Sequence, residues 1–196
     1  YQKEGKKIIE CEACGFKHID PIPSDTEIND FYQKQYFELI KLGGRAPEIK
    51  RLMNGGEEAE TERKWLKSTL YSDINRLLQE ALPEGKRNLC DIGCGTGDFL
   101  RYMNGISWKC TGIEPSETGT SFAEDSCLMI FNESLEGFIG KYPDHMASYD
   151  AVTLLNVLEH IPHPEVLIKQ VKRLLKPKEG IVCICVPNDF SAFQAA

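Results

Sequence analysis

The sequence predicts an α/β fold in which a doubly wound, mostly parallel sheet carries helices on both faces. Short apolar runs of about five residues are typical of buried parallel strands. They alternate with longer segments whose apolar residues recur every three or four positions, as in amphipathic helices. The first run, 88–92, leads into a glycine-rich turn and then a helix. Five such strands joined by helical crossovers predict the parallel order 3-2-1-4-5.

The composition is that of an ordinary globular protein. The 196 residues are 41% hydrophobic and 27% charged, with a net charge of −7, and such a chain can bury one sizeable core with a smaller attachment. An acidic chain disfavours a nucleic-acid partner, whose binding surface is usually basic. The sequence has no apolar run of about 18 residues and no signal-peptide pattern. We therefore expect a cytoplasmic protein without a membrane partner; its oligomeric state does not follow from the sequence.

The eight cysteines fall into two groups. Six lie in or beside expected strands and helices, where they act as small buried hydrophobes of a reduced cytosolic protein; these are Cys90, Cys94, Cys110, Cys127, Cys183 and Cys185. Cys11 and Cys14 instead form a Cys-Glu-Ala-Cys-Gly knuckle, with the spacing of two ligands of a tetrahedral zinc. The knuckle is only half a zinc site, with His18 as the one further candidate nearby. The alternative is a hairpin with two free thiols.

Two parts of the chain are expected, an N-terminal knuckle and helical lid at 1–57 and the main domain at 58–196. After a start signal at Ser24, residues 25–40 carry aromatic side chains at helical spacing. Polar residues and two glycine pairs mark 41–57 as a mobile linker or a lid. Apolar residues at three- and four-residue spacing then predict one long amphipathic helix up to Ala81, packed on the sheet.

The turn after the first strand is the predicted ligand site. Gly93, Gly95 and Gly97 lack a Cβ atom, so the backbone can turn sharply and a ligand can approach bare amides. The turn lies at the carboxyl ends of the strands, where doubly wound folds bind ligands. Its G-x-G-x-G spacing differs from the dinucleotide fingerprint G-x-G-x-x-G, and Asp98 at the start of the helix is expected to repel a phosphate. A cofactor without phosphate and with a positive centre, such as S-adenosylmethionine, fits better.

Leu-Cys-Asp-Ile-Gly-Cys-Gly-Thr-Gly at 89–97 resembles the first motif of the class I S-adenosylmethionine-dependent methyltransferases, which have a Rossmann-like domain. The resemblance implies that Asp91 and Gly93 hold the methionine amino group through a carboxylate and a backbone carbonyl. It also implies that Cys94, Gly95 and Gly97 form the loop around the cofactor chain.

The second motif ends the second strand. Glu114 follows Gly93 by 21 residues, the separation that brings a carboxylate on the neighbouring strand to the two ribose hydroxyls. Dinucleotide folds share this feature, and a solvated acid at a strand end is the alternative. Pro115 belongs to the same loop. After a short third strand at 128–131, the resemblance places Glu133 and Ser134 beside the adenine ring.

The third motif, from Tyr149 to Pro164, resembles the fourth-strand motif of quinone O-methyltransferases and sugar C-methyltransferases. The resemblance implies that residues from Asn156 to His160 line the floor of the site beside the transferable methyl group. His160 is the candidate general base for a hydroxyl acceptor, because its pKa range suits that role. A structural histidine behind the strand end is the alternative. Glu159 is a weaker candidate, and His145 and His163 are expected at the surface.

The N-terminal segment resembles the zinc-ribbon leader of some sugar and related methyltransferases, in which a cysteine knuckle is followed by Asp-Pro-x-Pro and a tyrosine pair. This resemblance implies zinc as a second cofactor at Cys11 and Cys14, and contacts from Tyr32 and Tyr36 to the bound ligand. The family fold usually adds two strands after the fifth, expected here at 181–186. We therefore expect the natural chain to be longer.

The leading functional hypothesis is an S-adenosylmethionine-dependent methyltransferase acting on a small-molecule acceptor, namely a sugar, a quinone or a similar metabolite. The reaction is an in-line displacement in which the enzyme mainly positions the reactants. A non-catalytic S-adenosylmethionine-binding module is one alternative. A nicotinamide-dependent oxidoreductase is another, disfavoured by the glycine spacing and Asp98. The sequence does not identify the acceptor or the atom that is methylated.

Overall fold

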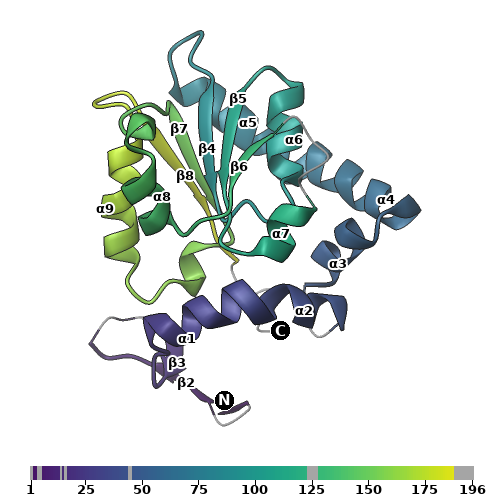
Figure 1. The fold of residues 1–196 in the computed structure, drawn as a ribbon, viewed down its shortest axis with the longest axis vertical. Coiled ribbons are helices and arrows are strands. Elements are labelled where there is room, and N and C mark those ends of the chain that lie inside the picture. Colours follow the sequence, from purple (N-terminus) through teal and green to yellow (C-terminus); the bar gives the residue numbers. More distant parts are fainter. Residues whose placement is uncertain are drawn as a thin grey trace.

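The computed structural model describes residues 2–3, 6–13, 15, 17–43, 46–122 and 128–187. A five-stranded parallel sheet forms its centre, with the strand order β6-β5-β4-β7-β8 (Figure 1). This order is the expected 3-2-1-4-5, because the central strand comes first in the main domain. The strands are β4 Asn88–Ile92, β5 Lys109–Ile113, β6 Met129–Phe131, β7 Ala151–Leu155 and β8 Ile181–Cys185.

Helices cover both faces of this sheet (Figure 1). One face packs against α5 Ser72–Ala81 and α6 Asp98–Gly105 through Leu78, Leu100 and Met103. The other packs against α8 Leu135–Lys141 and α9 Pro164–Leu174 through Phe138 and Val171. Side chains alternate between the two faces of a strand, and helices bury both faces of β4. Leu89 therefore contributes to the first core and Cys90 to the second. The two-sided core fixes where the carboxyl ends of the strands meet.

The N-terminal segment begins with a small antiparallel sheet of β1 Gln2–Lys3, β2 Lys6–Glu10 and β3 Lys17–Asp20. Cys11 lies in the connection between β2 and β3, whereas Cys14 lies outside the described residues. A helical stretch follows, made of α1 Asp25–Asp30, a π-helical turn η1 Phe31–Gln35 and α2 Tyr36–Lys41. Ser24 and Glu27 cap it reciprocally, which confirms the helix and the start signal read from the sequence.

Residues 41–57 were expected to form a mobile linker or a lid; an unstructured linker is wrong, because most of the segment is helical, and the lid stays a prediction. Residues Pro47–Asn54 form α3, with proline at its first position and Leu52 buried. Proline is favoured there because the first amides of a helix have no internal partner. The polar composition and the flanking glycine pairs conceal this eight-residue helix in the sequence. Gly55 and Gly56 both have positive φ, 71° and 73°, and make the sharp turn into the next helix.

The long helix expected at 58–81 exists but is interrupted. α4 Gly56–Leu66 passes through a π-helical turn, η2 Lys67–Tyr71, into α5. The first helical turn therefore begins two residues earlier than expected. π-Helical turns occur mostly as short insertions in α-helices and often lie at functional sites, and here both η1 and η2 contribute side chains to the same pocket.

Short helices complete the main domain. α7 Glu117–Ser121 is capped by Ser116, and two 3₁₀ turns follow, η3 Pro143–His145 and η4 Leu158–His160. The expectation that His145 lies free at the surface is wrong: it is half-buried and hydrogen-bonds the Tyr149 hydroxyl, stacked among aromatic rings. None of the helices in the described part of the chain has the length and apolar run needed to cross a bilayer.

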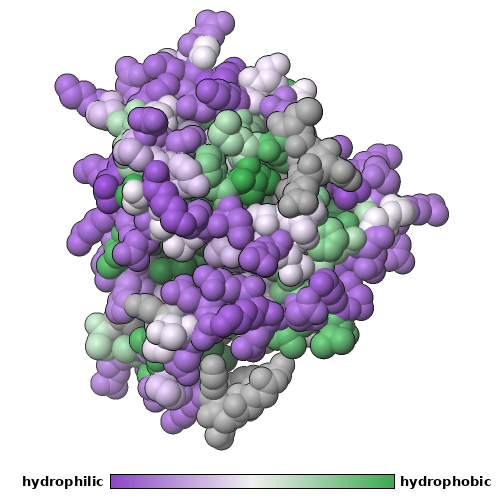
Figure 2. All heavy atoms as spheres, in the orientation of Figure 1, coloured by the Kyte–Doolittle hydropathy of each residue, from purple (hydrophilic) through white to green (hydrophobic). Residues whose placement is uncertain are grey.

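The N-terminal helices α1 and α2 lie across the carboxyl-end side of the sheet (Figure 1). In the same orientation, hydrophilic side chains cover most of the visible surface, and hydrophobic ones appear in the recess between these helices and the sheet (Figure 2). Phe37 and Ile40 of α2 are buried there, 4% and 0% exposed. Apolar packing thus holds α2 on the domain that carries the glycine turn.

Candidate functional site

A cavity of about 350 Å³ lies at the carboxyl ends of the central strands, below the N-terminal helices, within the range of small-molecule sites. Ten of the residues singled out in the sequence line it: Tyr36, Asp91, Gly93, Cys94, Gly95, Glu114, Pro115, Ser134, Asn156 and His160. Gly97 does not line the cavity. The structure thus brings these residues together, while their individual roles stay predictions.

The glycine turn leaves no room for a side chain at Gly93. Gly93 has φ 71°, and a Cβ built there would lie 2.6 Å from Cγ2 of Val157. Its amide donates to the Ile113 carbonyl at 2.8 Å, which ties the turn to the end of β5. Gly97 has φ 75° and precedes the first residue of α6, with its amide on the Cys94 carbonyl. Gly97 therefore shapes the turn from outside the cavity.

Glu114 joins the two loops that follow β4 and β5. Its two carboxylate oxygens accept hydrogen bonds from the amides of Gly95 and Ser116, each at 2.9 Å. The side chain is buried, and burial raises the pKa of this carboxyl although both hydrogen bonds oppose the shift. The Asn132 side chain holds the Glu114 carbonyl at 3.0 Å. Glu114, the residue predicted to bind the ribose, is thus held in place, and its carboxylate oxygens keep further lone pairs that can accept hydrogen bonds from a bound molecule.

Asp91 is the second-last residue of the central strand β4 and lies close enough to Glu114 for the two charges to interact. It is 3% exposed, and its carboxylate accepts a 2.6 Å hydrogen bond from the hydroxyl of Thr153, its registered neighbour on β7. Burial raises the pKa of Asp91 to about 7, with a further contribution from the nearby Glu114 charge. A buried carboxylate that meets no cation is costly to ionise. A cationic group of a ligand at this position would stabilise the charged form.

The argument that Asp98 repels a phosphate needs correction. The Asp98 carboxylate lies 2.8 Å from Nε of Arg63 on α4 and 3.5 Å from Arg101. It also accepts a hydrogen bond from the Thr96 hydroxyl at 2.7 Å. Its charge is therefore balanced by two guanidinium groups. The sequence could not show this, because Arg63 precedes Asp98 by 35 positions.

Helix α2 packs against α7 and comes within van der Waals distance of the glycine turn. The Phe37 ring packs so closely on Gly119 that a Cβ there would lie 3.0 Å from two ring carbons and 3.1 Å from Cγ of Glu114. The same ring lies 4.0 Å from the Cβ position of Gly95. Phe37 was not singled out in the sequence. The sequence held only two hints of this contact: an aromatic residue, Phe37, in the helix expected at 25–40, and a glycine, Gly119, three residues after Ser116.

Two side chains from distant parts of the chain meet on the other side of the cavity. The ring of Tyr32, in η1, lies 5.4 Å from the ring of His160, and 5.2 Å from that of Tyr36. Asn156, at the end of β7, has φ 55° and donates its amide to the Cys185 carbonyl at 2.8 Å. Left-handed backbone at a non-glycine residue often marks a functional site. His160 thus faces the cavity next to the lid tyrosines.

Glu133 and Ser134, which are expected to bind adenine, already make contacts that stabilise α8. The Ser134 hydroxyl caps α8 by accepting from the Gly137 amide at 3.1 Å. Glu133 is paired with Lys141 at the other end of that helix. Both residues line the cavity. Their backbone and the unused lone pairs of their oxygens remain for a ligand.

The apolar wall of the cavity was largely missed in the sequence. It comes from the lid helices and from the helix before β4, and includes Ile28, Ile49, Leu52, Leu66, Leu70 and Tyr71. Apolar residues at helical spacing were interpreted as core packing on the sheet. Only the tertiary fold shows that part of this face looks into the cavity.

The zinc prediction stays untested. Within the part of the chain that the structure covers, no three His, Cys, Asp or Glu side chains come together as metal ligands. Cys11 is described and half-buried, but its proposed partner Cys14 lies outside the described residues. His18 lies near Cys11, which contributes to raising the pKa of this histidine after the larger effect of the Ile19 carbonyl.

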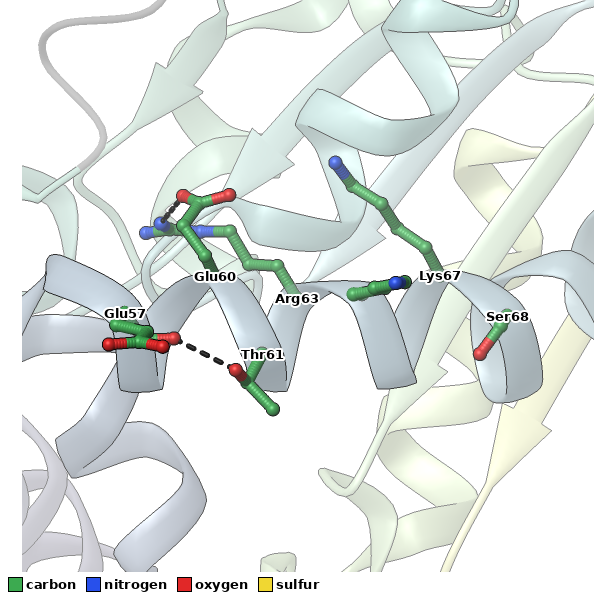
Figure 3. Close-up of a pocket in the computed structure, with 7 residues that line it drawn as sticks. Glu57, Glu60, Thr61, Arg63, Lys67 and Ser68 are labelled. Carbon is green, nitrogen blue, oxygen red and sulfur yellow. Dashed lines mark hydrogen bonds and ion pairs between the residues drawn. The ribbon is translucent and has the colours of Figure 1, made fainter.

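A second hollow runs along α4 and η2 (Figure 3). Its lining comes from one helical segment, with Glu60, Arg63 and Lys67 among the side chains drawn. Arg63 contacts Glu60 at 2.9 Å on this side and reaches Asp98 at the glycine turn with its other nitrogen. The hollow lacks a second wall and brings no catalytic group together. It matters for the charge distribution because the basic side chains Arg63, Lys64 and Lys67 line it.

Comparisons with known proteins place the chain in a family. The model of the family described as "Methyltransferase domain" matches residues 63–195. An enzyme of Marinobacter nauticus named ubiquinone biosynthesis O-methyltransferase is 32% identical over 133 residues, which cover 61% of this chain and 56% of that protein. The enzyme of the same name from Actinobacillus pleuropneumoniae serotype 7 is 35% identical over 111 residues, covering 53% and 47%. The chain spans about half the length of these curated relatives.

Solved structures support the same fold. A SAM-dependent methyltransferase from Archaeoglobus fulgidus superposes with a TM-score of 0.53 at 20% identity, covering 65% of this chain and 56% of that one. The [4+2]-cyclase SpnF gives a TM-score of 0.57 at 18% identity, covering 84% and 60%. Since a cyclase is among them, this likeness establishes the fold alone. By the family match and its own motifs, the chain belongs to the methyltransferase-domain family, as a class I S-adenosylmethionine-type methyltransferase domain.

Proposed function

We propose that this domain binds S-adenosylmethionine and transfers its methyl group to a hydroxyl of a small-molecule acceptor. One observation carries the proposal. Asp91 and Glu114, both buried, end adjacent strands beside a glycine turn, and among the described lining residues no lysine or arginine compensates them. A ligand with a cationic amine and a ribose diol satisfies both carboxylates. S-adenosylmethionine has both groups and no phosphate.

The charge of the cavity supports this cofactor over a nicotinamide dinucleotide. A pyrophosphate at the glycine turn would add negative charge beside Asp91 and Glu114. Cations usually accompany bound phosphates, and the described lining offers none. This reason replaces the one based on Asp98, whose charge is balanced by Arg63.

When bound, the cofactor supplies a methyl group activated by a sulfonium. The residues of the chain then position the reactants. Glu114 orients the ribose, Asp91 holds the amine, and the positive-φ glycine turn lets the amino acid end lie against the backbone. Phe37 and the other apolar lid residues keep water from the reacting groups. Well-oriented reactants can gain about 7–11 kcal/mol from positioning alone.

His160 is the proposed general base. It lines the cavity between Tyr32 and the end of β7, and a histidine can accept a proton from a hydroxyl near neutral pH. The curated relatives are named for O-methyl transfer in ubiquinone biosynthesis, which supports a hydroxyl as the accepting group.

Calorimetric titration with S-adenosylhomocysteine and, separately, with NAD tests the cofactor. We expect S-adenosylhomocysteine to bind and NAD not to bind. Glu114→Gln should weaken the first by about tenfold or more, because a hydrogen bond to a charged group contributes about 1.5–3 kcal/mol. Glu136→Gln, on the exposed side of α8, is the matched control and should change nothing. Binding of NAD alone would refute the assignment.

Transfer of radioactive methyl groups to hydroxyl acceptors tests the chemistry. His160→Ala should lower the transfer rate about 100-fold or more while leaving the affinity for S-adenosylhomocysteine within about twofold. An unchanged rate would show that the base is another group or that none is needed.

A further inference from the structure

The charged side chains that line the cavity have one sign. Five carboxyl groups contribute to it, and the described lining residues include no lysine or arginine; the five are Glu48, Asp91, Asp98, Glu114 and Glu133. The chain as a whole carries 23 lysines and arginines against 30 acidic residues. The imbalance is therefore a property of how the fold distributes charge and not of composition.

The nearby cations face elsewhere. Arg63, Lys64 and Lys67 line the outer hollow on α4 (Figure 3), and Arg51 of α3 pairs with Glu62 at 2.6 Å. Cations reach the cavity carboxylates only from outside, where Arg63 balances Asp98 and Lys141 balances Glu133. Of the five cavity carboxyl groups, three have no ion-pair partner among the described residues: Glu48, Asp91 and Glu114.

Two of these three belong to the proposed cofactor site, and Glu48 does not. Glu48 lies in the first turn of α3, after Pro47, and is exposed at the lid side of the cavity. No described residue forms an ion pair with it. It lines the same cavity as Asn29, Ile49 and His160, the last of which lies in η4. An acceptor held beside His160 therefore shares the cavity with an exposed carboxylate.

The remaining lid wall is apolar and aromatic. Tyr32 and Tyr36 lie with ring centroids 5.2 Å apart, and Ile28 and Leu52 extend the surface beside them. Such a wall takes a flat ring or an alkyl group. An anionic group on that molecule would lose hydration without gaining a cation and would meet like charge.

Resting on the proposed function, we propose that the site selects acceptors that carry no negative charge, and that Glu48 is a specificity-determining residue that disfavours anionic ones. The acceptor class is a neutral or cationic hydroxyl compound with a flat apolar part. Phosphorylated and carboxylated molecules are rejected. Two features produce this discrimination: the described lining of the cavity has no lysine or arginine, and Glu48 adds a negative charge.

Three catechols of similar size test the charge rule: neutral 4-methylcatechol, anionic 3,4-dihydroxybenzoate and cationic dopamine. Each is titrated at neutral pH into the protein saturated with S-adenosylhomocysteine. We expect the neutral and cationic compounds to bind, and the benzoate to bind at least about tenfold more weakly, because the described lining of the cavity offers it no lysine or arginine. Equal or tighter binding of the benzoate overturns the proposal.

Charge reversal tests the residue. Glu48→Lys should reduce the ratio of neutral to anionic affinity by about threefold or more, as expected for a change of two charge units at a partly solvated position. Glu58→Lys, on the exposed surface of α4 and outside both hollows, adds the same charge nearby and should leave the ratio unchanged. An unchanged ratio in Glu48→Lys, or an equal change in both variants, overturns the role of Glu48.

The two levels of the proposal fail differently. If S-adenosylhomocysteine does not bind, the proposed function fails and the acceptor rule falls with it. If S-adenosylhomocysteine binds but none of the catechols does, the cofactor assignment stands and the acceptor class is wrong.

Discussion

The ion pair between Arg63 and Asp98 joins the helix before the sheet to the glycine turn, and Arg63→Met tests its strength. The two side chains are 29% and 6% exposed, with Nε and Oδ1 2.8 Å apart. Removing one partner of a buried pair leaves an uncompensated charge, which costs about 3–5 kcal/mol. Here Arg101 at 3.5 Å and the Thr96 hydroxyl at 2.7 Å remain. We therefore expect a loss of about 2–3 kcal/mol of unfolding free energy.

The double-mutant cycle makes this reasoning refutable. Asp98→Asn removes the charge itself and should cost only about 1 kcal/mol. Adding Arg63→Met to it should then cost little more, since no unpaired carboxylate remains. Urea unfolding followed by the fluorescence of buried Trp108 measures all three variants. Arg76→Met, which breaks exposed pairs on α5, is the control and should cost under about 1 kcal/mol. Strictly additive losses in the cycle would show that the pair carries no coupling.

Three other outcomes are expected. Because burial raises the pKa of Asp91 from 3.8 to about 7, its native form holds a proton that the unfolded chain releases. Stability should therefore fall between pH 4 and pH 7, by up to about 4 kcal/mol, and level off above; urea unfolding of wild type against Asp91→Asn checks the slope, which should flatten in the variant. Gly93→Ala should cost about 2 kcal/mol, from the left-handed φ and the contact with Val157, and Val157→Ala should recover part of that loss in thermal unfolding; no recovery would place the cost in the backbone alone. If the knuckle holds zinc, elemental analysis should find about one equivalent per chain, lost in Cys11→Ser; a metal-free wild type would end that prediction.

The strand order was predictable because two-faced burial leaves a local pattern. The apolar runs that became β4, β5 and β7 need no distant partner to be recognised, whereas the run expected as a buried strand at 181–186 became the edge strand β8, with Val182 and Ile184 exposed. The glycine turn and Glu114 were also found from spacing alone, since backbone freedom and a strand-end acid have residue-type requirements. The structure puts both at one cavity.

The misses share a different cause. The sequence reading left 41–57 as a linker or a lid and missed the helix α3, because eight polar-rich residues between glycine pairs carry too few apolar side chains to show a period. His145 was placed at the surface because no neighbouring residue in the sequence indicates that it hydrogen-bonds Tyr149 and packs against Phe138 in an aromatic cluster. Tertiary contacts overrode weak local signals in both cases.

The sequence by itself thus determined the sheet, the helices that cover it and the residues that can meet at the strand ends, because burial period and turn chemistry are properties of neighbouring residues. Only the tertiary structure decided how charge is arranged. Asp98 is balanced by Arg63 from 35 positions away, and Asp91 receives the hydroxyl of Thr153 from 62. Electrostatic interaction depends on distance through space and on burial, and neither is written in the order of residues along the chain.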